Sequence, residues 1–151
     1  MTKLSKHFSS EEFSCPCGKC EAKRISPILI EKLQILRGWV GEPIFISKGG
    51  GVRCEKYNDR IGGYNKSPHL SGKAADISCK NTDIYKLATM AKLTGFKRIG
   101  LYPVSHFVHV DIIRPSPSTC WMRDITGAYK YFKPPKTLKN AIEFCKKLPY
   151  G

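Results

Sequence analysis

Apolar residues recur at steps of three and four positions in three segments of the chain, 27–39, 84–93 and 137–145. This spacing is the period of an α-helix with one buried face. Ser26 followed by Pro27 is also a typical start for the first of these helices. The pattern therefore predicts three amphipathic helices that each cover part of a core.

Three shorter runs, 43–47, 74–78 and 107–111, are rich in apolar residues and lie close to turn-forming residues. Runs of this length and composition are typical of β-strands. Side chains alternate between the two faces of a strand, so His109 and Asp111 should face the same side. We expect the last two of these strands to be antiparallel neighbours.

Together these elements predict an α+β domain in which a small antiparallel sheet is flanked by helices. A further strand is expected to begin at 119–122. The chain has 151 residues, of which 41% are apolar, and this is enough for one core without disulfides. No apolar run reaches the length that crosses a membrane. We therefore expect a single monomeric domain, 1–151, that does not insert into membranes.

Two histidines and one aspartate are candidates for holding a metal ion. His69 and Asp76 are separated by small residues, and His109 lies on a later predicted strand. Catalytic zinc sites use three protein ligands of these types and leave the fourth position for water or substrate. The three residues therefore predict an open zinc site of the kind found in hydrolases.

Seven cysteines raise the question of a second metal site. Cys15, Cys17 and Cys20 are close enough in sequence to place three thiolates around another zinc ion. His7 is the only histidine nearby and no fourth ligand is evident, so we favour a turn with free thiols over a structural zinc knuckle. The basic start of the chain is followed by no apolar signal segment, so we expect synthesis in the reducing cytosol. The other cysteines should then be free thiols as well: Cys54, Cys79, Cys120 and Cys145.

The charge of the chain favours a polyanionic partner. There are 26 Lys and Arg residues against 12 Asp and Glu, which gives a formal charge of +14. Nucleic acid and an anionic cell wall both fit this charge, and a generally basic surface without a specific partner is the interpretation that we favour. The aromatic residues are not interleaved with the basic ones, and no zinc-finger or helix-turn-helix spacing is present, so we expect no specific nucleic-acid binding.

A run of three glycines, 49–51, follows the first predicted strand. Such a run can cradle phosphate, but the Gly-Lys-Ser/Thr that completes a phosphate-binding loop is missing here. Arg53 follows the glycines, and a guanidinium group binds carboxylates through two parallel hydrogen bonds. We interpret Arg53 as a possible fork for a substrate carboxylate, with a solvated surface arginine as the alternative.

Several residues follow the spacing of a known family: a Ser-x-His-(x)6-Asp segment, a His-x-Asp segment further on, and an arginine and an asparagine before both. In this chain they are Arg53, Asn58, Ser67, His69, Asp76 and 109–111. Over residues 8–114 the chain resembles the zinc D-alanyl-D-alanine peptidase family, which leaves 115–151 as a C-terminal extension. That family is similar in fold to the hedgehog signalling domain and includes phage L-alanyl-D-glutamate endolysins.

The resemblance implies a role for each matching residue. His69, Asp76 and His109 would be the zinc ligands, and Arg53 would anchor a peptide carboxylate or the polarised carbonyl. The remaining implied substrate contacts are Asn58 and Ser67.

The resemblance leaves two candidates for the group that transfers the proton. Relatives often carry Glu or Asp three residues before the last zinc histidine, and here that position is His106. Histidine titrates near neutral pH and is therefore a candidate general base. Asp111 is the rival candidate, and it can instead orient a zinc-bound histidine.

The function implied by the resemblance is that of a zinc metallopeptidase. It would hydrolyse amide bonds in the peptide stems of bacterial peptidoglycan, as a D-Ala-D-Ala carboxypeptidase or as an endopeptidase such as a phage endolysin. Synthesis in the cytoplasm without a signal suits an endolysin that reaches the cell wall once another protein releases it. The alternatives are a catalytically silent hedgehog-like zinc-binding module and a basic nucleic-acid-binding domain with a structural zinc at the first cysteines.

Overall fold

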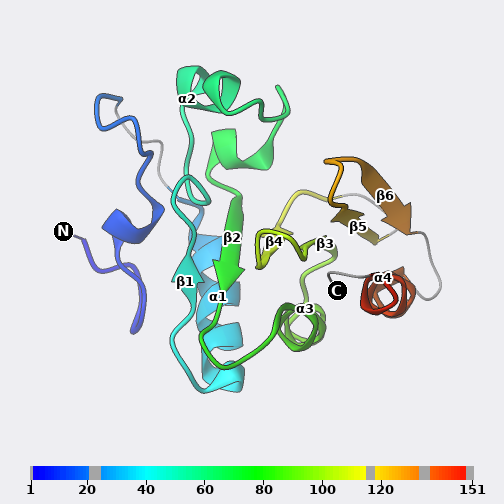
Figure 1. Cartoon of the computed structure of the whole chain (residues 1–151). Coiled ribbons are helices and arrows are strands. Elements are labelled where there is room, and N and C mark those ends of the chain that lie inside the picture. The colour runs from blue at the N-terminus through cyan, green and yellow to red at the C-terminus, as the bar shows by residue number, and fades with distance from the viewer. Residues whose placement is uncertain (1, 21–24, 115–117, 133–136, 149–151) are drawn as a thin grey trace.

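The computed structural model of the chain describes residues 2–20, 25–114, 118–132 and 137–148. Within these residues six strands form one sheet in the order β1-β2-β4-β3-β5-β6 (Figure 1). The elements along the chain are η1 (Ser10–Phe13), α1 (Pro27–Val40), β1 (Phe45–Ile46), α2 (Glu55–Arg60), η2 (Pro68–Ser71), β2 (Ala74–Ser78), α3 (Ile84–Leu93), β3 (Arg98–Tyr102), β4 (Phe107–Asp111), β5 (Thr119–Arg123), β6 (Tyr129–Phe132) and α4 (Thr137–Lys146).

The three predicted helices are confirmed as α1, α3 and α4, and the predicted strands correspond to β1, β2, β4 and β5. The sequence pattern predicted none of α2, β3 and β6. The α+β class is confirmed in its general form, since helices and a single sheet make up the described structure.

The sheet is not wholly antiparallel, so that part of the prediction is wrong. β3 and β5 run parallel, whereas the other neighbouring strands are antiparallel. Both edges of β4 are already paired, with β2 on one side and β3 on the other. β5 therefore joins the free edge of β3. It runs in the direction opposite to β4, which is the same direction as β3, so β3 and β5 are parallel.

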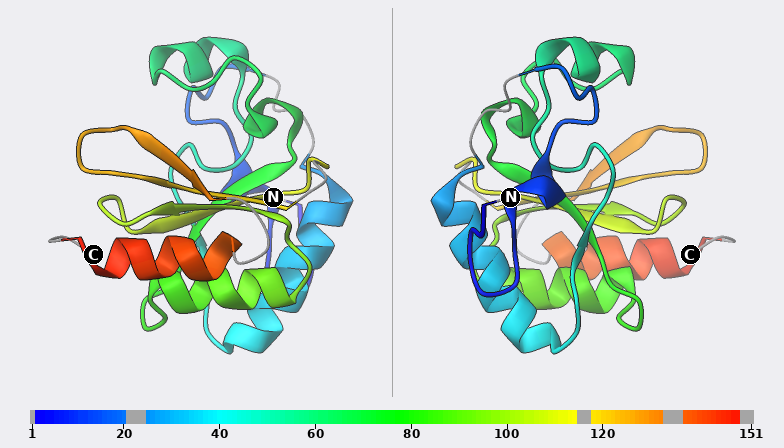
Figure 2. Two further views of the ribbon diagram at one scale, coloured as in Figure 1. Left: turned by 90° about the vertical axis from the view of Figure 1, so that its right-hand side faces the viewer. Right: turned by 90° about the vertical axis from the view of Figure 1, so that its left-hand side faces the viewer.

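One face of the sheet carries the core. Figure 2 shows α1, α3 and α4 together on this face, with α2 and η2 on the other side of the sheet. Directly paired residues project to the same face. Ile77, Val108, Leu101 and Met122 form one such row across four strands, and all four side chains are completely buried. The opposite face is therefore free to carry polar chemistry.

The part of the chain after residue 114 joins the same sheet and core. β5 pairs with β3, β6 pairs with β5, and α4 lies beside α3 and the end strands. Cys120, Leu138, Ala141 and Cys145 are buried within the common core. Among the described helices, none is both long and apolar enough to cross a membrane.

Helix α1 shows how the apolar period becomes burial. Pro27 occupies the first helical turn, and Gly41 ends the helix in the left-handed conformation with a φ of 77°. Leu33 is completely buried in the core, whereas Ile35, two positions on, keeps 45% of its surface exposed. The two residues are aliphatic side chains on opposite faces of one helix, so they allow a buried and an exposed position to be compared.

We predict that Leu33→Ala lowers the free energy of unfolding by about 2–5 kcal/mol, because it removes buried methyl groups and leaves a cavity. Ile35→Ala is the control, and its effect should stay within about 0.5 kcal/mol because the residue lies at the surface. Urea denaturation of both variants measures the difference. Equal effects of the two substitutions would contradict the burial of this helix face.

Candidate metal centre

The three predicted zinc ligands come from three different elements and meet on the sheet face that lacks the core. His69 lies on η2, where the Ser67 hydroxyl accepts a hydrogen bond from the His69 backbone N–H at 3.3 Å. Asp76 on β2 pairs directly with His109 on β4. The predicted antiparallel pairing of these two strands is confirmed, and it places the aspartate and the second histidine side by side.

The distances within this triad fit a zinc ion. Asp76 Oδ1 lies 3.3 Å from His69 Nε2 and 3.0 Å from His109 Nδ1. One ligand atom from each residue lies within 4.8 Å of the others. Zinc bonds to nitrogen and oxygen are about 2.0–2.1 Å long, so neighbouring ligands of a tetrahedral ion are about 3.3 Å apart. The donor atoms of His69, Asp76 and His109 therefore fit the ion that the sequence predicts.

Hydrogen bonds orient both rings. His69 Nδ1 lies 2.8 Å from the Gly51 carbonyl, so this nitrogen donates and Nε2 keeps its lone pair on the side of Asp76. His109 Nε2 lies 2.8 Å from Asp111 Oδ2, which leaves Nδ1 as the ligand atom. Fixing the distal nitrogen of a histidine in this way selects the tautomer that binds metal.

Asp111 lies on the far side of the His109 ring from Asp76. Its side chain is fully buried, and its oxygens accept from Arg98 Nε at 2.9 and 3.0 Å and from the Ile113 N–H at 3.1 Å. The Arg98 charge offsets the cost of burying this carboxylate. The contacts suit a residue that holds His109 in place.

Burial and mutual contact shift the pKa values of the triad in the absence of metal. Burial would raise the pKa of Asp76, but the charges and hydrogen bonds of His69 and His109 outweigh it and hold the pKa well below its usual range. Burial lowers the pKa of His69. Burial also acts to lower the pKa of His109, but hydrogen bonds to Asp111 and Asp76 raise it to about 9. The site is therefore built around an ionised Asp76.

Arg53 reaches the same carboxylate from the loop before α2. Its Nη2 lies 3.3 Å from Asp76 Oδ2, while Nε donates to the Gly49 carbonyl at 2.6 Å and Nη1 to Asn58 Oδ1 at 3.2 Å. Asn58 is buried and donates in turn to the Tyr64 carbonyl at 2.9 Å. The side chains of Asn58 and Ser67 thus form hydrogen bonds within the protein. Their expected contacts with substrate stay predictions.

The glycine run 49–51 has a packing explanation. A Cβ on Gly50 would lie 2.7 Å from the Cβ of Asp76, and one on Gly51 would lie 2.5 Å from the Cα of Phe13. Real Cβ atoms do not approach other atoms so closely. The loop needs glycine because its backbone passes between η1 and the metal centre.

His106 lies apart from the triad. It is exposed, it occupies the turn between β3 and β4 with a φ of 56°, and it lines a pocket of about 420 Å³ with 78–85 and Pro103. It lies three positions before His109, which corresponds to about 10 Å along a strand. No ligand of the triad lines this pocket. Its expected role as general base stays a prediction.

An aromatic wall beside the centre was not foreseen from the sequence. Asp76, His109, Gly100, Trp121 and Tyr131 form a row of directly paired residues across the open face. A Cβ on Gly100 would lie 2.6 Å from the Trp121 indole, so glycine lets the indole cross β3 toward His109, where the ring centroids are 5.2 Å apart. The signal in the sequence was the group of four aromatic residues in the segment 119–132, Trp121, Tyr129, Tyr131 and Phe132.

The structure is thus a small α+β domain whose sheet carries two histidines and one aspartate, the donor set of an open zinc site. A family model described as Peptidase M15 matches residues 6–111, and the chain belongs to the Peptidase M15 family. Peptidases of this family are zinc-dependent, so the chain is a metallopeptidase by family. The match confirms the resemblance noted above at the level of a zinc peptidase family. Among curated proteins, none matches the chain.

We predict that Asp111→Ala weakens zinc binding by about 10–100-fold, because His109 loses the carboxylate that fixes its tautomer and orientation. Asp59→Ala, which removes an exposed carboxylate on α2, is the matched control and should bind zinc as the wild type does. Competition with a zinc chelator measures both affinities. Unchanged affinity in the Asp111 variant would show that Asp111 does not support the centre.

Proposed function

We propose that this protein hydrolyses amide bonds in the peptide stems of bacterial peptidoglycan with one zinc ion held by His69, Asp76 and His109. The observation that carries the proposal is the buried triad, whose ligand atoms are spaced as a tetrahedral zinc requires. The protein contributes three ligands, and catalytic zinc sites keep the fourth position for the reaction. Bound zinc supplies Lewis acidity, which polarises a carbonyl and makes water a stronger acid.

The chain's own residues would prepare this centre for peptide hydrolysis. Asp111 holds the His109 ring, and the Gly51 carbonyl holds the His69 ring, so both ligand nitrogens point to one place. Arg53 stands beside Asp76 and donates three hydrogen bonds within the protein. A guanidinium has five N–H donors, and the others suit a substrate carboxylate or the oxygen of the scissile carbonyl.

Two further features support a cell-wall peptide as the substrate. Peptide stems carry free carboxylates, which match both Arg53 and the formal charge of +14. The Trp121 and Tyr131 side chains extend the open sheet face beside His109, and Tyr131 is exposed. An aromatic surface next to the centre offers packing area for the rest of a stem peptide.

We predict that the wild-type protein releases free amines from purified peptidoglycan without releasing new reducing sugar ends, because it cuts peptide bonds and not glycan bonds. His109→Ala should lose zinc and at least about a hundredfold in rate, since losing a metal ligand removes much of the binding energy. His7→Ala, which removes an exposed histidine hydrogen-bonded to Gln34, is the matched control and should keep full activity.

The measurement is amine release per mole of zinc-loaded protein, with sugar ends counted in the same digest. A wild-type protein that holds its zinc in the triad but releases no amine from peptidoglycan would contradict the proposal. That result would favour the catalytically silent zinc-binding module.

For proton transfer we retain His106 as the candidate, because Asp111 is buried behind His109 with both oxygens occupied. This role requires the turn between β3 and β4 to bring His106 closer to the triad when substrate binds, since the side chain lies apart from it here. His106→Ala should keep its fold and its zinc but lose about 100–10,000-fold in turnover, which is the usual contribution of a general acid or base. Turnover and zinc content are measured on the same sample, with His7→Ala again as the control. Digestion at the wild-type rate would show that another group moves the proton.

A further inference from the structure

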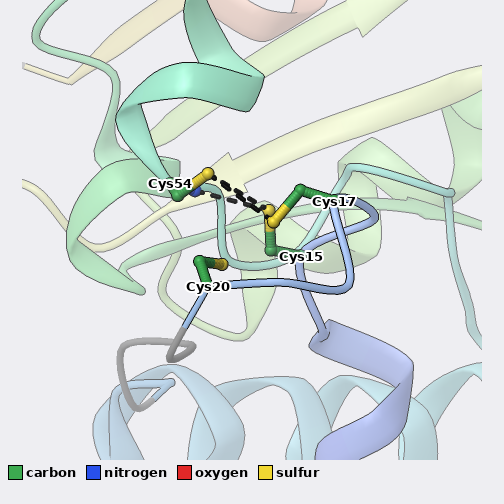
Figure 3. A group of neighbouring side chains, drawn as sticks. All are labelled: Cys15, Cys17, Cys20 and Cys54. Carbon is green, nitrogen blue, oxygen red and sulfur yellow. Dashed lines mark hydrogen bonds between the residues drawn. The ribbon is translucent and has the colours of Figure 1, made fainter.

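A second group of metal-binding side chains lies outside the triad. Cys15, Cys17 and Cys20 belong to the loop after η1, and Cys54, which is 39 positions after Cys15, joins them at the start of α2 (Figure 3). We call these four residues the cysteine cluster. The expectation that the first three cysteines have no fourth ligand is therefore wrong, because the fold supplies one from a distant segment.

The sulfur atoms of the cluster are spaced as in a four-thiolate metal site. Cys54 Sγ lies 3.8 Å from both Cys15 Sγ and Cys17 Sγ, and all four sulfurs lie within 4.8 Å of one another. Zinc–sulfur bonds are about 2.3 Å long, so two thiolates on one tetrahedral zinc are about 3.8 Å apart. All four are free cysteines in the structure.

Backbone N–H groups point at the sulfurs, as they do around metal-bound thiolates. The Cys54 N–H donates to Cys15 Sγ at 3.5 Å, and the Tyr57 N–H donates to Cys54 Sγ at 3.4 Å. Such donors would stabilise negative charge on the sulfurs of Cys15 and Cys54.

We propose that Cys15, Cys17, Cys20 and Cys54 bind a second zinc ion, which has a structural role. Four thiolates fill the coordination shell of zinc and leave no position for water, so this site would not be catalytic. Cys15 is buried and the other three are partly buried, which places the ion beneath the surface of the loop. A tetrahedral set of four sulfurs selects zinc over harder cations such as magnesium or calcium.

The position of the cluster indicates what the metal would hold. Cys54 directly follows Arg53, and the Val52 N–H donates to the Phe13 carbonyl at 2.8 Å. The Arg53 N–H donates to the His69 carbonyl at 3.1 Å. A zinc ion in the cluster would therefore fasten the N-terminal loop to the segment that positions Arg53.

The first test is the zinc content of the protein after purification under reducing conditions, measured by native mass spectrometry. We expect two zinc ions in the wild type, one in Cys20→Ser, one in His109→Ala and none in the double variant. Cys79→Ser removes a cysteine outside the cluster and should keep two ions. A wild type that binds one zinc, lost in His109→Ala and kept in Cys20→Ser, would overturn the second site while leaving the triad intact.

The second test uses only the wild-type protein, so it does not depend on the folding of a variant. Cysteines are alkylated before and after zinc removal by a chelator, and the modified positions are identified by peptide mass spectrometry. Cys15, Cys17, Cys20 and Cys54 should be protected until the chelator is added. Equal alkylation in both samples, or native disulfides among these four residues, would overturn the proposal.

A third test replaces zinc with cobalt. Cobalt bound by the cysteine cluster should give thiolate-to-cobalt absorption, and the His109→Ala variant should retain it.

Discussion

The buried negative charge of Asp76 is the constraint around which the site is arranged. Moving a carboxylate out of water costs several kcal/mol unless charged or hydrogen-bonding partners replace the lost hydration. Here His69, His109 and Arg53 surround it, and they come from η2, β4 and the loop before α2. Each partner is itself held, by the Gly51 carbonyl, by Asp111 and by Asn58 respectively. One charge thus draws together segments that are far apart in sequence.

The support of His109 extends further along the sheet than the ligands themselves. Arg98 pairs with Asp111, and its guanidinium also lies over the Trp121 ring, 5.1 Å from the centroid. The Trp121 indole donates to the Tyr102 hydroxyl at 3.2 Å. A chain of contacts therefore runs from the metal centre through β3 to β5, and the orientation of one ligand depends on strands that contribute no ligand.

Local signals predicted the local structure well. The 84–93 helix was placed correctly because its apolar period and its flanking residues are all within a few positions of one another, and Asp83 caps it. The pairing of β2 with β4 was also predictable, since two well-marked strands each carried an expected ligand. The joint presence of His69, Asp76 and His109, together with the family resemblance, predicted that these three residues would meet.

What the sequence did not reveal depends on contacts between distant segments. Cys54 could not be assigned to the cysteine cluster before the fold brought α2 next to the N-terminal loop. The parallel pairing of β5 follows from which strand edges remain free, and the position of Trp121 follows from that pairing. His106 was placed by analogy with relatives, but a turn with a positive φ sets where its side chain lies.

The aromatic residues beside the metal centre and the predicted metal ligands lie on different strands, so their sequences can change separately to some extent. The predicted metal ligands come from η2, β2 and β4, all within the matched residues 6–111, whereas Trp121 and Tyr131 come from the later hairpin of β5 and β6. Tyr131 projects from the outermost strand of the sheet and is exposed. Substitutions at Tyr131 can therefore change the outer end of the open face without touching a predicted metal ligand, whereas changes at Trp121 also reach the Arg98 side chain that supports Asp111.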